Sequence, residues 1–431
     1  MSEETIVQWL LHNEVQVHPS IKISRSPSGE HIITSTGSIP ASTTLLSIPA
    51  SAIITAASSS LLERIPSLAE KSQWTILILT VMYEASKPDS KWRAYFDSLP
   101  TEFDTLMYWT QDELKELEGS AVLNKIGKEE AEAMYLEEIK TFVDSNGEAF
   151  GGVDVSLEAF HKAGSWIMAF SSDFEKQGNT RNEDAMDEDD DDDDEYDSLD
   201  TDKVLVPFGN LVQIDCDLAN CEFLPSGTSI SLIATKTIPE NTALYTDPGP
   251  VPRSDLLRRI GRYPESSAQN DVVEIDSTLL ISIAGKNLSD SARDSRIERL
   301  VEEELLEDSY DIEADGGIPS EILIVIQTFL VDDETFASYA AEEKFPKAKK
   351  DARTRDVVLE IIQKRKEGFM TSREEDISIL ATSGEVLSRR KKMAVEVRLG
   401  EKEILRKMEE VARSWADTTE SHSRSAKRQK R

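Results

Sequence analysis

The sequence predicts an α+β protein in which a β-rich core is interrupted by a helical insertion and followed by an all-α C-terminal domain. Short runs of Ile, Thr and Leu, separated by Pro and Gly, occur in residues 21–49 and return in residues 204–263. Between these regions, about residues 59–174 carry apolar residues at helical spacing, and helices rich in Glu, Lys and Arg follow residue 351. With 431 residues, the chain is long enough for two or more domains.

Two similar hairpin patterns lie far apart in the predicted β core. The segment that begins Ile39-Pro40 is echoed by the segment that begins Ile238-Pro239, and in both an Ile-Pro turn separates two short apolar runs. Because proline fixes φ and has no amide proton, each pair should lie at a turn or at a sheet edge. We expect the excursion between them to return so that both patterns join one sheet assembly.

The excursion and the C-terminal part carry helix signals. Residues Ser72 to Ala85 form an apolar run of helix length, Asp112 to Asp144 has apolar residues at helical spacing, and Ser156 is a suitable N-cap. The aromatic residues of KWRAYFDSLP are expected to pack in the core. Further on, Pro319 to Val331 is predicted to be a buried helix, and Ser372 begins a capping box.

These signals give a predicted domain organisation. It comprises an N-terminal helix (1–20), a β core (21–282) with a helical insertion (about 59–174) and an acidic loop (about 177–203), a helical domain (285–416) and a basic tail (417–431).

One segment carries a large share of the net charge of -34, because residues 183–202 hold 14 Asp and Glu and no Lys or Arg, and the rest of the chain is moderately acidic. Like charges this dense repel one another and bury nothing, so the segment is predicted to be a disordered insertion, with capture of a basic partner as the alternative. Affinity for phosphate groups comes from Lys and Arg, so we expect no direct nucleic-acid partner. Basic proteins are the expected partners.

Composition also argues against several kinds of site. The two cysteines, Cys216 and Cys221, and five scattered histidines form no metal-ligand spacing and no disulfide framework, so no metal is expected. The longest apolar run, near residues 74–82, is shorter than the ~20 residues that span a bilayer. We expect an intracellular monomer with no membrane contact.

The tail SHSRSAKRQKR predicts a nuclear protein, also present in the cytoplasm, if it is an import signal; the alternative is a solvated terminus.

Five blocks occur in an order that carries more information than any one of them. They are SGEHIITSTGSIP, KWRAYFDSLP, VPFGNLVQIDCDLANCEF, ATKTIPENTALY and SDLLRRIGRY. In this order the chain resembles the SET-domain lysine methyltransferases of the Rubisco-methyltransferase type, and it is most similar to their fungal members that act on ribosomal lysines. The likeness covers nearly the whole chain. It implies a SET-type β core with a helical insertion, followed by an all-α substrate-binding domain.

The resemblance implies transfer of a methyl group from S-adenosylmethionine to a lysine amine of a ribosomal or other basic protein. A free lysine has a pKa near ~10.4, so a dry channel beside the sulfonium must lower it. The amine must also lie in line with the bond that breaks, which is a matter of positioning. SET folds thread one segment under another, so that cofactor and lysine enter one channel from opposite faces.

The family's motifs fall on specific residues of this chain. Its first cofactor loop, Gly-x-Gly, reads Gly29-Glu30-His31, and its Asn-His pair reads Gln213-Ile214. The resemblance implies that these residues and Gly249 bind the cofactor.

Other motif positions differ or persist. The family's Asp after the Val-Pro strand falls on Asn210, its downstream Asn is Asn220, and its later Tyr-Gly-aromatic reads Ile260-Gly261-Arg262. In the Tyr-Gly signature the tyrosine is replaced by Pro248, so Tyr245 or Tyr263 is the candidate for the catalytic hydroxyl. The sequence therefore predicts an active protein-lysine N-methyltransferase, and the alternative is a catalytically impaired SET-fold module that binds proteins.

Overall fold

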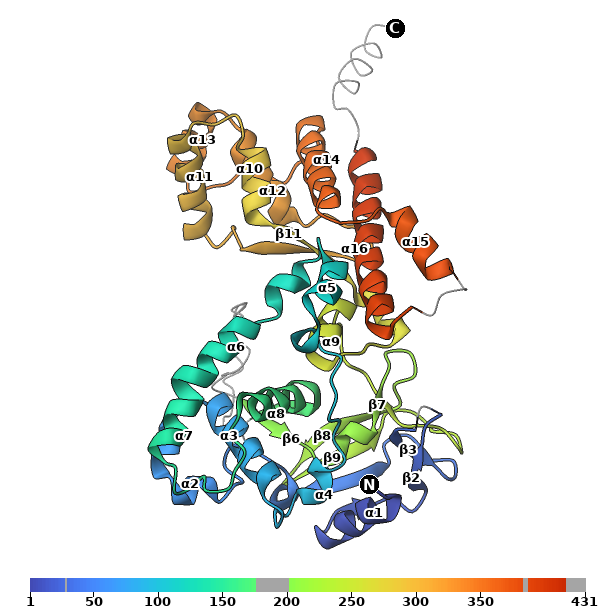
Figure 1. Ribbon diagram of the computed structural model, residues 1–431. Coiled ribbons are helices and arrows are strands. Elements are labelled where there is room, and N and C mark those ends of the chain that lie inside the picture. Colours follow the sequence, from blue (N-terminus) through green and yellow to red (C-terminus); the bar gives the residue numbers. More distant parts are fainter. Residues whose placement is uncertain (28, 176–200, 383–386, 416–431) are drawn as a thin grey trace, which may run out of the picture. The chain divides into compact units, whose positions relative to one another are not determined.

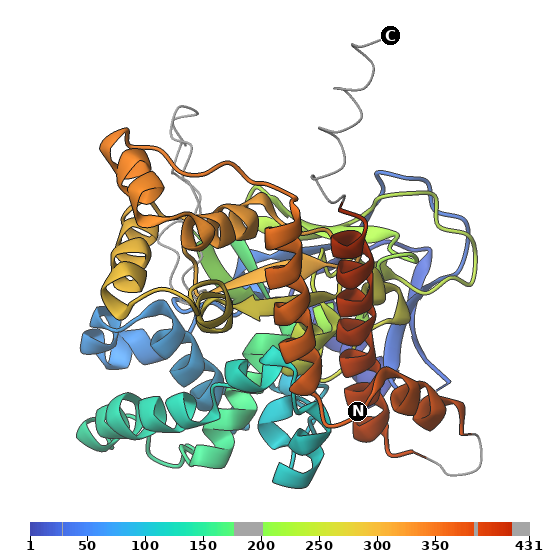
Figure 2. The same ribbon diagram turned by 90° about the horizontal axis from the view of Figure 1, so that it is seen from above.

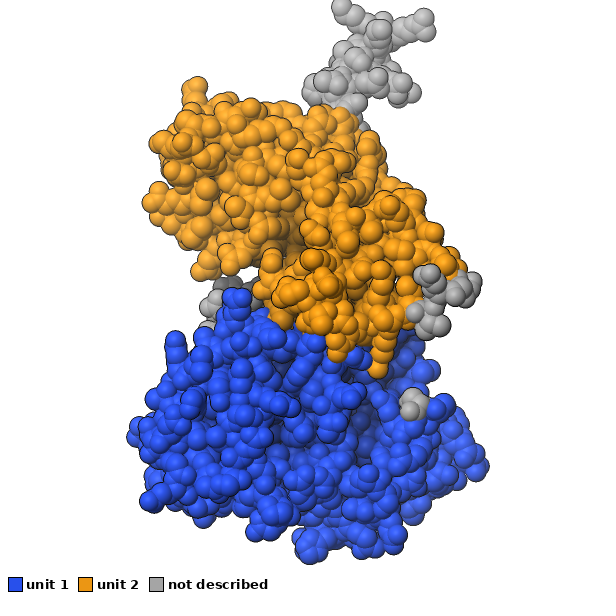
Figure 3. All heavy atoms as spheres, in the orientation of Figure 1, with its two compact units in different colours: residues 1–108, 127–249, 259–266 blue, residues 109–126, 250–258, 267–431 orange. Residues whose placement is uncertain are grey.

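The computed structural model describes residues 1–27, 29–175, 201–382 and 387–415. These residues form two compact units, coloured separately in Figure 3. Unit 1 comprises residues 1–108, 127–249 and 259–266, and unit 2 comprises residues 109–126, 250–258 and the chain from residue 267 onward. The predicted helical insertion is thus divided, because residues 109–126 belong to unit 2. The predicted acidic loop and basic tail lie outside the described residues, apart from residues 201–203.

Unit 1 contains short strands and the helices that cover them (Figure 1). The strands are β1 (Gln16–Val17), β2 (Ile21–Arg25), β3 (His31–Ser35), β4 (Thr44–Pro49), β5 (Ser171–Glu175), β6 (Thr201–Leu205), β7 (Gln213–Ile214), β8 (Cys221–Ser226), β9 (Ser229–Ala234) and β10 (Tyr245–Thr246). The helices are α1 (Glu3–His12), α2 (Leu61–Arg64), α3 (Gln73–Ser86), α4 (Arg93–Phe96), α6 (Lys128–Met134), α7 (Thr141–Ser145) and α8 (Leu157–Phe170). Single turns are η1 (Ala50–Ala52), η2 (Pro66–Glu70), η3 (Leu106–Tyr108) and η7 (Gly209–Leu211), and η6 (Tyr135–Lys140) is a π-helix.

The two Ile-Pro patterns meet in the structure, as the sequence predicts. Ile39 and Ile238 form an antiparallel bridge, with each backbone N–H donating to the other residue's carbonyl at 2.9 and 2.8 Å. Strand β4, which follows Ile39 in the chain, pairs with β9, which precedes Ile238. The strand order of this sheet is β1-β4-β9-β8. Strands β2 and β3 form the first predicted hairpin, with Ile21 opposite Ser35. The excursion therefore returns to the sheet from which it departs.

Helices of unit 1 begin where capping residues predict. The side chains of Ser72 and Ser156 accept the amide protons of Thr75 and Ala159, so α3 and α8 start at the expected positions. Helix α3 is buried along most of its length and packs against α8 (Figure 1). The aromatic rings of Trp92, Tyr95 and Phe96 lie in the core, which confirms that this cluster is structural.

Two helix predictions differ from the structure. The N-terminal helix ends at His12, well before residue 20, and β1 follows it. The expected helix from Asp112 to Asp144 is a series of short helical segments. Both Gly119 and Gly127 have positive φ inside this stretch, which a continuous right-handed helix excludes.

Unit 2 is mainly helical. Its helices are α5 (Gln111–Leu114), α9 (Arg253–Ile260, of which 253–258 belong to this unit), α10 (Ser277–Ala284), α11 (Asp290–Glu302), α12 (Ser320–Leu330), α13 (Asp333–Ala341), α14 (Ala352–Glu367), α15 (Arg373–Ala381) and α16 (Arg389–Arg413). The short 3-10 helices of this unit are η4 (Lys115–Leu117), η5 (Ala121–Lys125) and η8 (Glu265–Asn270, of which 267–270 belong to this unit). Helix α14 lies beside α16 in both views (Figure 1 and Figure 2).

The C-terminal part is not purely helical, because β11 (Val272–Asp276) and β12 (Ser309–Glu313) form a two-stranded antiparallel sheet. Within β12, Tyr310 and Ile312 are buried while their neighbours face outward, an alternation typical of a strand. The mostly helical character and the α+β class are as predicted. The predicted helix near residues 319–331 and the capping box at Ser372 are both present.

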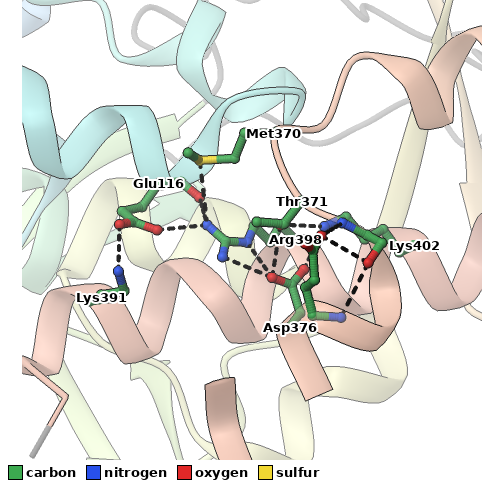
Figure 4. A network of polar contacts seen from close by, with 9 residues as sticks. Glu116, Met370, Thr371, Asp376, Lys391, Arg398 and Lys402 are labelled. Carbon is green, nitrogen blue, oxygen red and sulfur yellow. Dashed lines mark hydrogen bonds and ion pairs between the residues drawn. The ribbon is translucent and has the colours of Figure 1, made fainter. Parts of the chain in front are cut away.

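Residues 109–126 are tied to α16 by charge. The first turn of α16 contains no acidic residue although the positive end of a helix dipole favours one. Glu113 and Glu116 supply that charge from α5 and η4, through ion pairs to Arg390 (3.0 Å) and Lys391 (2.8 Å). Figure 4 shows Arg398 reaching Glu116 on one side and Asp376 on the other. The described part of the chain has no helix long and apolar enough to cross a membrane.

Candidate functional site

A backbone crossing lies at the centre of the candidate site. The segment of residues 243–246 is hydrogen-bonded along one edge by residues 213–215, because the amides of Gln213 and Asp215 donate to the carbonyls of Leu244 (3.0 Å) and Thr246 (3.1 Å). Alternate carbonyls of an extended segment point to opposite edges. The other edge is held by Asn220, so that residues 243–246 pass between two parts of the chain.

Asn220 is the residue that closes this crossing. Its side chain is 3% exposed, donates from Nδ2 to the carbonyl of Ala243 (2.9 Å) and accepts the amide proton of Tyr245 at Oδ1 (3.0 Å). Its own amide donates to the carbonyl of Tyr245 (2.9 Å). These bonds satisfy groups that would otherwise be buried without partners. Asn220 therefore holds residues 243–246 from the edge opposite residues 213–215.

Cys221, the next residue, does not act as a nucleophile in this geometry. Its thiol is buried and donates to the carbonyl of Tyr245 (3.3 Å). Burial raises the pKa of Cys221 to about 12, so the reactive thiolate is absent at neutral pH.

The predicted first cofactor loop is the turn between β2 and β3. Gly29 has φ of +88°, and the guanidinium of Arg25 donates to its carbonyl (2.7 Å). Strand β3 then connects the loop to the crossing. The amide of Leu244 donates to the carbonyl of Ile33 (2.9 Å), and Thr34 forms a bridge with Ala243.

His31 is the first residue of β3 and replaces the family's second glycine. Burial, the nearby Arg25 and the N-terminal amino group together lower its pKa, so the imidazole is neutral at physiological pH. Its Nε2 atom is buried and has no hydrogen-bond partner in the described residues.

Residues 259–266 form a third side of the site. Gly261 has φ of +75°, and a Cβ added there would lie 2.6 Å from the amide nitrogen of Thr105. Only glycine permits this close approach. The next residue, Arg262, forms an ion pair with Glu30 of the cofactor loop (3.6 Å).

The same segment also meets the residues that follow β7. The hydroxyl of Ser266 donates to Asp215 Oδ1 (3.0 Å) and accepts the amide proton of Cys216 (3.2 Å). Residues 215–216, which lead from β7 to Asn220, are thereby fixed by residues 259–266.

The structure brings most of the predicted site residues together. Tyr245 pairs directly with Gln213, and Thr246 with Ile214, in the parallel pair β10–β7. The loop of Gly29, Glu30 and His31 joins them through β3. Gly249 has φ of +81°, and its amide donates to Asp247 (2.9 Å).

The catalytic roles of Tyr245 and Tyr263 stay predictions. Both side chains are half-buried, and Tyr263 lies directly after Arg262 in the segment that packs on Thr105.

Among the described residues, no three His, Cys, Asp or Glu side chains are grouped as metal ligands.

Several contact residues of the site were missed by sequence reasoning. Thr105, Asp215 and Ser266 belong to no motif, and their spacing in the sequence gives no sign that they meet. Among the contacts of the site, the one between Glu30 and Arg262 had a signal in the sequence, namely their opposite charges. A pair of single charges is too common to identify a contact.

Comparison with known proteins confirms the resemblance inferred from the sequence blocks. Residues 287–405 match the family described as Rubisco LSMT substrate-binding. Ribosomal lysine N-methyltransferase 4 of Saccharomyces cerevisiae is 27% identical over 354 residues, which cover 76% of this chain and 71% of the yeast protein. The N-lysine methyltransferase setd6 of Xenopus laevis is 22% identical over 405 residues and covers 86% of each chain.

Solved structures confirm the fold class. The structure of Rubisco LSMT bound to sinefungin and monomethyllysine covers 96% of this chain and 92% of its own, with a TM-score of 0.72 and 19% identity. The crystal structure of the SET domain of LSMT bound to lysine and AdoHcy has a TM-score of 0.71 at 19% identity, and covers 95% of this chain and 90% of that one. At this identity the likeness shows the fold, a SET core followed by a mainly helical domain.

Proposed function

We propose that this chain, which resembles the Rubisco-methyltransferase type of SET-domain proteins in sequence and fold, is an S-adenosylmethionine-dependent protein-lysine N-methyltransferase. The observation that carries the proposal is the crossing of residues 243–246 between residues 213–215 and Asn220. Such a crossing joins the loop of residues 29–31, the pair β7–β10 and residues 259–266 around one place. A cofactor and a lysine side chain can be positioned there against each other.

The residues present fit the cofactor. The loop at Gly29 leaves its backbone exposed, and Gly249 has positive φ where a side chain would be strained. His31 offers a buried nitrogen without a protein partner. S-adenosylmethionine supplies an electrophilic methyl group when it is bound.

The protein's contribution to the reaction is positioning and removal of water. Burial lowers the pKa of a lysine amine and so favours its neutral form. The neutral amine has the lone pair that attacks a methyl group. A tyrosine hydroxyl beside the amine orients this lone pair by a hydrogen bond. Tyr245, on the strand that Asn220 clamps, and Tyr263, next to Arg262, are the candidates for that hydroxyl.

The proposed substrate is a ribosomal or other basic protein, which the chain acts on as a monomer. The protein's charge of -34 favours association with a basic partner. A relative in this comparison carries the name ribosomal lysine N-methyltransferase, which supports the ribosomal substrate. We propose a nuclear location, with a cytoplasmic fraction, from the basic sequence of residues 421–431; a fluorescent fusion that enters the nucleus equally well without these residues would contradict it.

One observation favours a second function, that of a catalytically impaired module that binds proteins. Pro248 stands where the family has the tyrosine of its Tyr-Gly signature, and proline has no hydroxyl. If neither Tyr245 nor Tyr263 substitutes for the missing group, the crossing would bind ligands without turnover.

The deciding experiment incubates the purified full chain with a ribosomal protein extract and radiolabelled S-adenosylmethionine. An enzyme transfers label to a basic protein, and Tyr245→Phe or Tyr263→Phe removes most of the transfer. Absence of label, together with absence of S-adenosylhomocysteine binding in calorimetry, would contradict the enzymatic function.

A second arm addresses the alternative. Pro248→Tyr restores the family's hydroxyl. If the wild type binds S-adenosylhomocysteine but transfers no label, and Pro248→Tyr transfers it, the binding module is the correct reading.

A further inference from the structure

A cleft of about 320 Å³ lies along one face of α16, within unit 2. Four residues of α16 that line it are Glu396, Gly400, Glu403 and Lys407, and their three-and-four spacing places them on the same face of the helix. The facing walls come from α9, η8, the residue after β12 and α15. The fold of unit 2 thus builds the cleft from segments that are far apart in the sequence.

A buried ion pair lies at this cleft. Nε of Arg253 donates to Asp271 Oδ2 (2.9 Å), the backbone amide of Arg253 donates to Oδ1 (3.1 Å), and the two side chains are 12% and 8% exposed. Gly400 leaves room for the pair, because a Cβ at that position would lie 2.6 Å from Arg253 Nη2. Glycine is unfavourable in a helix interior, and this close packing accounts for its place in the middle of α16.

The two glutamates of the cleft also have partners. Glu403 accepts hydrogen bonds from Arg373 (2.6 Å) and from Arg406 (2.8 Å), one on each carboxylate oxygen. Glu396 lies 3.5 Å from Lys392. Together with the ion pair of Arg253, these contacts neutralise the carboxylates of the cleft from within the protein.

The remaining lining is mostly apolar. It consists of Ala268, Ala314, Leu380, Leu399 and Ile404. Lys407 is the last charged residue of the cleft, and its ammonium donates to the carbonyl of Ala314. Water between apolar walls has few polar partners, so an apolar group that displaces it gains affinity.

Size and charge together define the guest that fits. An apolar cavity of roughly 150 Å³ is large enough for benzene, so the cleft of about 320 Å³ admits an aromatic or large aliphatic side chain with part of its backbone. A basic guest would be buried beside Arg253 and Lys407, and an acidic one beside Glu396 and Glu403. Either would lack a counter-charge, because the charged groups of the cleft are already paired.

We propose that this cleft anchors one large apolar side chain of the protein substrate, apart from the lysine that is methylated. The proposal rests on the proposed function and extends it by naming a second recognition point and its chemistry. Most of the α16 wall, up to Ile404, lies within residues 287–405, which match the substrate-binding family model, and this favours a substrate protein as the occupant. The negative charge of the chain attracts basic proteins in general, whereas an anchor in the cleft selects among them.

Ligand-observed NMR on the full chain tests the chemistry of the cleft without any methyl transfer. N-acetyl-tryptophanamide should bind, and N-acetyl-argininamide at the same concentration should not. Ala268→Phe fills the cleft and should abolish binding of the tryptophan probe. Ala337→Phe is the matched control, because Ala337 is exposed on α13 and does not line the cleft. Absence of tryptophan binding to the wild type, equal binding to Ala268→Phe, or preference for the arginine probe would overturn the proposal.

Methyl transfer to a ribosomal protein extract gives a second readout. Ala268→Phe and Leu399→Asn should each raise the extract concentration that gives half the maximal rate by about tenfold, the change that loss of ~1.4 kcal/mol produces. Leu399→Asn keeps the size of the side chain but makes it polar, so the two variants act by different routes. The maximal rate and the melting temperature should change far less, whereas a merely structural role would lower both.

The two levels of the proposal fail in different ways. If the wild type transfers label and neither variant changes the half-saturating concentration by more than about twofold, the cleft assignment is wrong and the proposed function stands. If the wild type transfers no label, the proposed function is wrong, and the role of the cleft in substrate binding falls with it. Self-association of the wild type that Ala268→Phe abolishes in size-exclusion chromatography would identify a second copy as the occupant and would also overturn the assignment.

Discussion

Replacing Glu401 with glutamine should make the protein's stability less sensitive to pH between about 5.5 and 7.5. Glu401 lies on α16 with 5% of its surface exposed. One of its oxygens accepts the hydroxyl proton of Ser120, and the other has no hydrogen bond. Burial raises the pKa of Glu401 to about 8, and the carboxylates of Asp271 and Glu274 act in the same direction.

The hydrogen bond from Ser120 and the guanidinium of Arg365 both oppose this rise in pKa, and the contact with Arg365 is a weak one. Its Nη2 lies 4.0 Å from Glu401 Oε2, a distance that would suit an ionised pair. The guanidinium is already engaged by the carbonyls of Gly119 (2.9 Å) and Glu274 (3.0 Å). Since a pair at 4.0 Å does not offset burial of a charge, we expect Glu401 to hold its proton at neutral pH.

The direction of the pH effect follows from the raised pKa. An unfolded chain releases this proton near the ordinary value of 4.5, whereas the folded chain keeps it until about 8. The stabilisation is complete below 4.5 and is lost as pH rises to 8, because the folded state binds more protons throughout that window. Each pH unit removes about 1.4 kcal/mol, so the loss between pH 5.5 and 7.5 is about 3 kcal/mol.

Urea denaturation of the wild type and Glu401→Gln at pH 5.5, 6.5 and 7.5 measures this effect. Glutamine keeps an acceptor for Ser120 but does not titrate, and all other titrating groups are common to the two proteins. The unfolding free energy of the variant should rise relative to the wild type by about 1.4 kcal/mol per pH unit. A difference that stays constant with pH would refute the reasoning and would mean that Glu401 is ionised and paired with Arg365.

Two other substitutions test what stabilises each unit from within. Asn220→Ala leaves the carbonyl of Ala243 and the amide of Tyr245 without their partners, and should lower the unfolding free energy by about 2–5 kcal/mol in denaturant titration; a loss below about 1 kcal/mol would show that water replaces the side chain. Asp376→Asn removes the charge that pairs with Arg398 where both side chains are fully buried, and should cost about 3–5 kcal/mol; an unchanged midpoint would show that Arg398 finds compensation elsewhere.

Local signals in the sequence predicted local structure well. The serines at positions 72, 156 and 372 cap helices as expected, because a cap depends on only four consecutive residues. The placement of residues 109–126 in unit 2 was not predictable in this way. It depends on contacts such as Glu116 to Arg398, which are 282 positions apart in the chain. Strand β12 was missed although Tyr310 and Ile312 alternate with exposed residues, because five residues are too few to outweigh the helical flanks.

The candidate site was predictable where a motif exists. The resemblance located Gly29, Gln213 and Asn220, and the structure brings their segments together. Contacts such as that of Thr105 with Gly261 depend on how loops close, and neither composition nor spacing encodes them. Sequence reasoning therefore located the strands of the site and missed the loop residues that contact one another around it.

The hydrogen bonds of the crossing and the methyl-transfer reaction depend on different residues. Residues 243–246 are held by backbone groups and by Asn220, and none of these bonds involves the side chain of Ile214 or Pro248. The hydrogen bonds of the crossing therefore do not depend on the side chains at those two positions, so likeness of fold does not by itself imply turnover.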